Sequence, residues 1–356
     1  MTPTATVLAG RQIFVASAPV STMIVASRGV DVDLGHRCLH GRDVHRLVAA
    51  VVALAVLGPA RAEVVEEVPA IPPRRSLGPH LFLPRDGVPD PFVASYIASS
   101  SGVATGSAKG PTFDLDGKPV NLEDYKILTY SQLFSGQWGI ADFWALRLRM
   151  LGSFYSGTNA PGLVGVGVNG LVRGSVGTTL GFQLADRLRL GVLIDVTWGP
   201  SVAVSILDTI RQSVSSGSVQ ALVDNSYSTT VTPTVSLAWA IARGWGAIFN
   251  ATYANGVVEV NQGTSDADMA VVQATVEVDL RELGSIPLGI GADYSAGYSL
   301  GRTRFRRYVA GLGFFFTGRP GLTVGLDLSY RRAPLGSAEV FVSSFSGTFA
   351  LRYTFD

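Results

Sequence analysis

The amino-acid sequence predicts an all-β protein whose strands close into an antiparallel transmembrane β-barrel. The main observation is a repeated run of about ten residues in which apolar and polar side chains alternate, followed by a tight turn. Successive side chains of a strand point to opposite faces, so each run has one apolar and one polar face. The last run shows this: Phe349, Leu351, Tyr353 and Phe355 share one face, and Ala350, Arg352, Thr354 and Asp356 the other.

Hydropathy supports a membrane location for these strands. The mean hydropathy is +0.31, yet no segment after residue 62 approaches the ~20 consecutive apolar residues of a membrane-spanning helix. Apolar content that is spread evenly over alternating strands indicates lipid on one side of the wall and a polar lumen on the other.

The first 62 residues are expected to be absent from the mature protein. Residues 45–62 have the pattern of a secretory signal peptide: two basic residues, an apolar run over 47–57, and small residues at Ala60 and Ala62. Residues 1–44 precede that signal, so we interpret them as a translation start assigned too early; a disordered extension is the alternative. The mature chain is then expected to begin near Glu63.

The composition after residue 62 excludes several functions. The segment has 22 Lys and Arg against 24 Asp and Glu, a net charge of −2, so no nucleic-acid partner is expected. The single cysteine, Cys38, precedes the expected cleavage site, which excludes disulfides and thiolate metal sites. Only His80 remains, and no histidine follows it to serve as a general base near neutral pH. We therefore expect no enzymatic activity, no cofactor and no metal.

Residues 63–91 contain seven prolines and no periodic pattern, so we expect an extended periplasmic leader. The barrel is expected over residues 92–356. Its most regular runs give ten strands, and two further runs near the start give twelve; because single-chain bacterial barrels close with an even number, twelve is preferred and ten is the alternative. The expected strands cover residues 92–100, 125–134, 144–155, 176–184, 188–198, 231–241, 245–253, 270–280, 286–294, 308–316, 322–330 and 341–355.

Short turns alternate with long connections along the chain, at about 156–170, 199–228, 254–268 and 331–340. Outer-membrane barrels have short periplasmic turns and longer external loops, so both chain ends are expected in the periplasm. Within the longest connection, residues 201–214 show helical spacing of Val202, Ile206, Ile210 and Val214. A short helix there could narrow the barrel mouth, or pack on neighbouring loops.

The charged residues of the strands fall on the polar phase, as lipid outside the barrel would require. We take ten of them as candidate pore-lining residues: Arg147, Arg149, Arg189, Asp195, Glu277, Asp279, Asp293, Arg307, Asp327 and Arg352. They could select solutes by charge. The alternative for each is a structural ion pair inside a narrow barrel, which burial would itself require.

Two short motifs favour ordinary turns over ligand sites. Residues 165–170 match G-x-G-x-x-G, but no crossover helix or βαβ unit surrounds them, as a dinucleotide site needs. Residues 112–123 partly match a calcium-binding loop, with Asp114, Asp116, Gly117 and Glu123 in suitable positions. Thr112 stands where the first aspartate is expected, so an Asp-Gly turn is the better reading.

The signal-like leader, the alternating hairpins and the terminal Tyr353-Thr354-Phe355 resemble Gram-negative bacterial outer-membrane β-barrel proteins of the porin and transporter kind. The resemblance implies that Tyr353 and Phe355 form an assembly signal read by the barrel-insertion machinery. The chain departs from the pattern in ending with Asp356 and in having Ala350 where glycine is common. The implied partners are outer-membrane lipid, the insertion machinery and a small-molecule solute.

The expected function is therefore that of an outer-membrane channel or transporter for passive or facilitated passage of small molecules. The alternative is a structural or surface-interaction protein with a plugged barrel. A translocator of a secreted passenger is disfavoured, because a leader of about 30 residues is too short to be a passenger.

Overall fold

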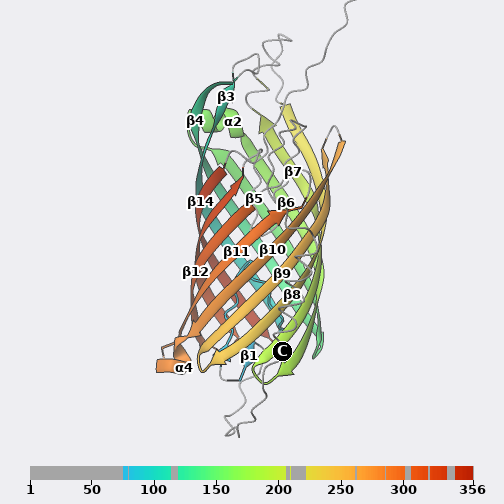
Figure 1. Cartoon of the computed structure of the whole chain (residues 1–356), viewed down its shortest axis with the longest axis vertical. Coiled ribbons are helices and arrows are strands. Elements are labelled where there is room, and N and C mark those ends of the chain that lie inside the picture. Colours follow the sequence, from blue (N-terminus) through green and yellow to red (C-terminus); the bar gives the residue numbers. More distant parts are fainter. Residues whose placement is uncertain are drawn as a thin grey trace, which may run out of the picture. The chain divides into compact units, whose positions relative to one another are not determined.

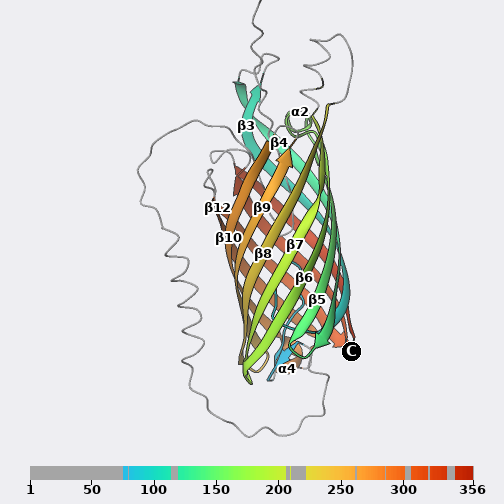
Figure 2. The same ribbon diagram turned by 90° about the vertical axis from the view of Figure 1, so that its right-hand side faces the viewer.

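In the computed structural model, the chain forms a closed barrel of twelve antiparallel strands (Figures 1 and 2). The structure describes residues 75–78, 80–113, 119–205, 209, 222–260, 263–284, 286–300, 306–319, 321–334 and 341–355. The expected signal peptide at 45–62 and the segment 1–44 lie outside the described residues. The wall strands are β3 Ser95–Phe113, β4 Pro119–Ala141, β5 Trp144–Gly157, β6 Val168–Ala185, β7 Leu188–Ser205, β8 Leu222–Ala242, β9 Trp245–Val260, β10 Gly263–Asp279, β11 Leu288–Ser299, β12 Arg306–Arg319, β13 Leu322–Pro334 and β14 Phe341–Phe355.

Each strand pairs with the next one in the sequence, and β14 closes the barrel by pairing with β3. The prediction of a closed antiparallel barrel with twelve strands is confirmed, and the last strand has the expected bounds, Phe341–Phe355. The tight turns all lie at one end, which we call the turn end. The longer connections lie at the other end, the loop end (Figure 1).

Most strands extend beyond the predicted runs toward the loop end. For example, β8 was expected over 231–241 and begins at Leu222. The outward positions of this extension include Asn225 and Thr229, which are exposed and polar. The hydropathy alternation stops there although the backbone ladder continues, because a wall that has left the lipid no longer needs apolar side chains outside.

A short helix in a loop-end connection is present at α2 (Ala160–Val166), where none was expected. Residues 201–205 continue β7: Val202 is 41% exposed on the outside, whereas Ala203 is 8% exposed on the inside. This two-residue period is that of a strand, so the helical prediction was wrong for this part. Residues 206–208 and 210–214, which include the expected gate, lie outside the described residues.

The outer surface of the barrel is apolar. Along β5, Leu148 and Met150 are 49% and 58% exposed, whereas the alternating Arg147 is 5% exposed. The same pattern holds around the wall, and in water so large an apolar surface would cause aggregation. The outward face therefore requires a hydrocarbon solvent. Neither the α2 segment nor any other helix of the described part is long and apolar enough to span a membrane.

The segment before β3 enters the lumen at the turn end. It begins with a two-strand hairpin, β1 (Ser76–Leu77) and β2 (His80–Leu81), and continues without regular structure to Ser95. We call residues 75–94 the plug; Pro79 within it lies outside the described residues. The sequence suggested a periplasmic leader over 63–91, but the described residues of 75–91 lie inside the barrel.

Candidate functional site in the barrel lumen

Apolar plug side chains form a small core with the inner wall. Phe82 is fully buried, and Phe92 is 2% exposed. They pack in one cluster with Ala238 and Ala240 of β8 and Ile248 of β9. Because two of these wall side chains are small, the lumen is wide enough there for two phenyl rings.

Wall glycines bring the plug even closer to the strands. A Cβ on Gly246 of β9 would lie 2.3 Å from the His80 ring, and one on Gly191 of β7 would lie 2.6 Å from Cβ of Pro91. Real Cβ atoms do not approach other atoms so closely, so any larger residue would displace the plug. The inner wall is therefore shaped to this segment.

Ion pairs and a hydrogen bond attach the middle of the plug to β10, β11 and β13. Nη2 of Arg85 lies 2.6 Å from Oδ1 of Asp293 on β11 and 2.8 Å from Oδ1 of Asp327 on β13. The backbone N–H of Leu83 donates to Oε2 of Glu277 on β10 at 2.7 Å. All of these groups are almost completely buried, so each carboxylate depends on its plug partner for compensation.

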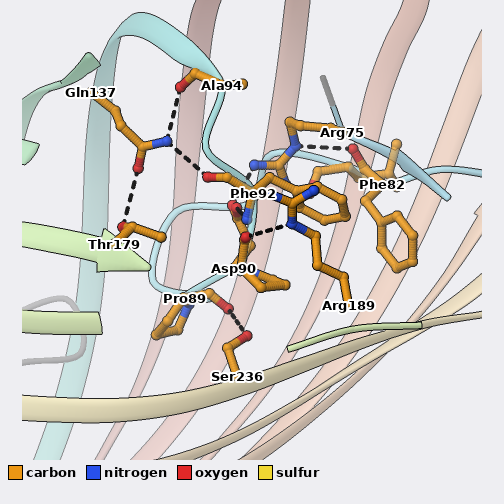
Figure 3. Close-up of polar contacts among 12 residues, drawn as sticks. Arg75, Phe82, Pro89, Asp90, Phe92, Ala94, Gln137, Thr179, Arg189 and Ser236 are labelled. Carbon is orange, nitrogen blue, oxygen red and sulfur yellow. Dashed lines mark hydrogen bonds and ion pairs between the residues drawn. The ribbon is translucent and has the colours of Figure 1, made fainter. Parts of the chain in front are cut away.

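The last part of the plug is held by hydrogen bonds from the wall (Figure 3). Nε2 of Gln137 donates to the carbonyl oxygens of Phe92 and Ala94, both at 2.8 Å, and Nε of Arg189 donates to that of Pro91 at 3.0 Å. The Phe92 ring also contacts two guanidiniums, Arg75 at 5.4 Å and Arg189 at 5.7 Å from the ring centroid. Such contacts add cation–π attraction to apolar burial.

A hydrogen-bonded ion pair within the plug stabilises its fold. Nη1 of Arg75 donates to Oδ2 of Asp90, and Oδ1 of Asp90 accepts the N–H of Phe92 at 3.1 Å. Burial alone raises the pKa of Asp90, but the positive charges of Arg75 and Arg352 and these hydrogen bonds outweigh it and hold the pKa below 3.8. Asp90 is therefore a carboxylate at neutral pH.

The plug contacts the wall on all sides. Its partners described above, together with Ser236 of β8 and Gly181 of β6, come from β4, β6, β7, β8, β9, β10, β11 and β13. The plug therefore spans the lumen between opposite walls near the turn end.

His80 is a titratable plug residue without a close hydrogen-bond partner among the described residues. It is 1% exposed, and its Nε2 lies 3.9 Å from Oε2 of Glu277. Neither ring nitrogen has a hydrogen-bond partner within the described part of the chain. The ring is held instead by edge-on contact with Phe82, with centroids 4.5 Å apart.

A polar pocket lies beside the plug on its loop-end side. Arg147 and Arg149 of β5 and Arg352 of β14 line it, together with Arg85 and Asp86 of the plug. Arg147 donates to Asp195 of β7 at 2.5 Å. The guanidinium of Arg352 stacks on the Tyr96 ring, with Cζ 3.4 Å from the centroid.

The structure places the ten candidate pore-lining residues on the inner side of the wall. Four of them bind the plug, namely Arg189, Glu277, Asp293 and Asp327; Arg147, Arg149 and Arg352 line the pocket, and Asp195 binds Arg147. The other two lie apart: Asp279 accepts from the N–H of Arg281 at the helix α4 (Leu280–Gly284), and Arg307 is buried in β12.

Sequence reasoning missed the plug residues that complete this network, above all Arg75, Arg85 and Asp90. The available signal was a pair of unpaired inward carboxylates, Asp293 and Asp327, on strands that carry no neighbouring cation near the turn end. Inward glycines that face the plug on β6, β7, β9, β11 and β12 were a second signal, because a lumen lined by glycine leaves room for an insert.

The structure describes residues 165–170 of the first short motif, but the Asp-Gly turn expected at Asp116 and Gly117 of the second lies outside the described residues. Residues 165–170 span the end of α2, a turn at Gly167 with φ of 70°, and the start of β6. Residues 112–113 and 119–123 belong to the hairpin of β3 and β4, whereas 114–118 lie outside the described residues. No group of three or more potential metal ligands occurs among the residues that the structure describes.

The loop end has an apolar cluster of its own. Val166 of α2 packs with Tyr125 and Ile127 of β4 and Tyr155 of β5, all on the inner side. Asn159 caps α2 by accepting the N–H of Gly162 at 3.0 Å, and its side chain also bonds to the β4 backbone. The helix is thereby fixed against the barrel mouth, which is the position that had been expected for residues 201–214.

No known protein family and no curated protein matches the sequence. Among solved structures, the barrel is similar to the translocator domain of the autotransporter NalP from Neisseria meningitidis (12% identity, 73% of this chain and 88% of that chain, TM-score 0.48). It is also similar to the Pseudomonas putida toluene transporter TodX (12%, 75% and 90%, TM-score 0.37) and to the NanC porin (8%, 71% and 100%, TM-score 0.41). At these values the likeness carries no inference about function.

Proposed function

We propose that this protein is a bacterial outer-membrane channel for small polar solutes, closed at its turn end by a displaceable N-terminal plug. The observation that carries the proposal is the plug itself, a separate segment seated in a lumen whose wall has many inward charged and hydrogen-bonding side chains. The proposal includes no catalytic step. It places the turn end and the N-terminus in the periplasm.

The outer surface supports the membrane location. Exposed tryptophans gather close to the tight turns, including Trp138, Trp144, Trp239 and Trp245. Tryptophan favours the boundary between hydrocarbon and water, so these side chains fit a belt at the turn-end interface. A resident of the outer membrane also fits the terminal Tyr353 and Phe355, whose rings stack 6.2 Å apart; we retain these two as the proposed assembly signal.

The middle of the lumen supports passage rather than a packed core. Many of its inward side chains are small or hydrogen-bonding, for example Thr234 with Thr252 at 2.9 Å and Ser329 with Ser346 at 2.6 Å, although Met269 and Val271 of β10 also point inward. A barrel with a purely mechanical role could fill this space with large apolar residues. Polar lining of this kind is typical of barrels that hold water.

A reversible lock tests the gate. A Cβ on Gly289 of β11 would lie 3.2 Å from Cγ of Leu83, so the double variant Leu83→Cys, Gly289→Cys places two sulfurs within bonding reach. The mature chain is expected to contain no other cysteine. In planar bilayers, the reduced protein should show discrete conductance steps and the oxidised protein none, while Leu83→Cys alone should be insensitive to oxidation.

Two outcomes would contradict this mechanism. If the oxidised double variant conducts like the reduced one, the plug is not the gate. If both forms insert and remain silent, the alternative is favoured: a structural or surface-interaction protein with a permanently plugged barrel. The extensive contacts of the plug around the wall are the observation that keeps this alternative open.

A further inference from the structure

We propose that the pocket beside the plug binds a small oxyanion, a carboxylate or phosphate group, through Arg149 and Arg352. The inference rests on the proposed channel only for its role in transport; the site itself stands on the geometry of the pocket.

Strand register brings the two arginines to opposite sides of one hollow. Arg352 pairs laterally with Ala98, Ala98 with Ser135, and Ser135 with Arg149. These four residues form one row across β14, β3, β4 and β5, about 14 Å long at a strand spacing of about 4.8 Å. The two middle residues are small, so the guanidiniums flank a depression in the curved wall.

The neighbouring row supplies the support. Tyr96 pairs with Gln137, and Gln137 pairs with Arg147. The Tyr96 ring lies against the guanidinium of Arg352 and fixes its plane, while Gln137 holds the plug backbone. The plug is thus the floor of the pocket.

Four arginines that line the pocket have a buried N–H group without an acceptor among the described residues. These groups are Nη1 of Arg85 and the Nε atoms of Arg147, Arg149 and Arg352. A buried donor without a partner is costly, and native structures rarely keep several together. A bound oxyanion, with several lone pairs on each oxygen, satisfies such donors at once.

The charge balance favours an anion. Four arginines line the pocket against two carboxylates, Asp86 and Asp90. Asp90 is bound by Arg75, and the lining residue Arg85 is bound by Asp293 and Asp327 outside the pocket. Neither Arg149 nor Arg352 forms an ion pair or a side-chain hydrogen bond within the described residues; Arg352 stacks on the Tyr96 ring, and its charge also acts on Asp90. Oδ2 of Asp86 is a buried acceptor without a donor among the described residues, so a ligand that also carries a hydroxyl group suits the site better than a simple anion.

Binding is measured on the purified full-length mature barrel in non-ionic detergent by calorimetric titration with inorganic phosphate, succinate and malate. We expect saturable binding, with malate bound more tightly than succinate. Arg149→Gln and Arg352→Gln should each weaken it roughly tenfold or more, because each removes a charged hydrogen-bond donor. The matched control is Arg307→Gln, which removes an inward arginine of β12 far from the pocket row.

Absence of saturable binding to all three probes would overturn the proposal, and so would binding that neither arginine variant weakens. Binding that Arg307→Gln weakens equally would also overturn it, since general lumen charge would then explain the result. If a glutamine variant fails to fold, as judged by heat-modifiable electrophoretic mobility, Arg149→Lys and Arg352→Lys keep the charge, lose the planar fork and should still weaken binding. Because titration needs no ion flow, a protein that binds but never conducts would refute the channel and leave the site intact.

Discussion

Replacement of Arg85 by methionine should release the plug. Methionine keeps much of the side-chain length and apolar surface, but it leaves Asp293 and Asp327 without their shared cation. The Arg85 side chain is 3% exposed, and the two carboxylates are 10% and 12% exposed. Removal of one partner from such a buried pair costs about 3–5 kcal/mol. The closed state alone has this cost, because the displaced plug leaves both carboxylates to water.

Destabilisation of the closed state by about 3–5 kcal/mol raises the ratio of displaced to seated plug by roughly a hundredfold to several thousandfold. Val88 offers a direct assay, since it is 6% exposed within the plug core. A cysteine at position 88 reacts with a soluble maleimide only while the plug is displaced. The labelling rate should therefore rise by this factor in Arg85→Met, and the channel open probability should rise with it.

The triple variant Arg85→Met, Asp293→Asn, Asp327→Asn is the matched control. It removes the uncompensated charges together with their partner, so most of the seating should return. The reasoning is refuted if Arg85→Met forms a heat-modifiable barrel in which the cysteine at 88 reacts no faster than in the parent. It is also refuted if the triple variant labels as fast as Arg85→Met.

Three further perturbations test other contacts of the plug. Gly246→Val should open the channel without unfolding the barrel, because the valine side chain occupies the space of the His80 ring. Conductance measures opening, and heat-modifiable mobility measures folding. An unchanged conductance would contradict the close contact between Gly246 and His80. Phe92→Ala should weaken plug seating by about 3–5 kcal/mol, seen as faster cysteine labelling, and a rate within twofold of the parent would contradict it. Acidification should loosen the plug, because the pKa of Asp90 is lowered in the folded state. The Asp90 carboxylate contributes its full stabilisation of the seated plug above the ordinary pKa of 3.8, and this stabilisation is lost as pH falls through the lowered pKa. Labelling against pH measures this loss, and Asp90→Asn should remove that part of the pH dependence.

The barrel could be predicted because lipid acts on every outward position of every strand. The alternation in β14, from Phe349 to Phe355, is enforced by the solvent outside and does not depend on any particular neighbour. The turns at Gly244 and Gly321 could also be predicted, because glycine is the residue that most readily adopts positive φ. Both glycines do adopt it, at 71° and 77°. Such local signals are sufficient for strand number and for register along the chain.

The plug could not be predicted by the same means. Its contacts join residues far apart in the sequence, such as Arg85 with Asp327, and no periodicity marks them. The prolines at 84, 89 and 91 indicated an extended segment, but the plug folds back on itself through the β1–β2 hairpin and a turn at Gly87, and the prolines gave no information about its position. The inward glycines Gly191 and Gly246 make room for the plug, and this role can be recognised only in the folded structure, where Pro91 and His80 lie against them.

Helix α2 was missed for a different reason. It has only seven residues, two of them glycine, and it lacks a polar face, so helix propensity is poor. Its stability comes from the Asn159 cap and from packing of Val166 on the tyrosines of the barrel mouth. Val202 and its neighbours had better helical spacing, yet pairing with β6 and β8 made them part of a strand.

The direct passage of the chain from Ala94 of the plug to Ser95 of β3 has a mechanical consequence. Because the plug is part of the same chain, a displaced plug cannot diffuse away. Because no linker separates it from β3, it also stays close to the rim of the barrel. Return is then a unimolecular event at high effective concentration, with a rate independent of protein concentration. The plug of the proposed channel can therefore return to its seat in the same molecule after each opening.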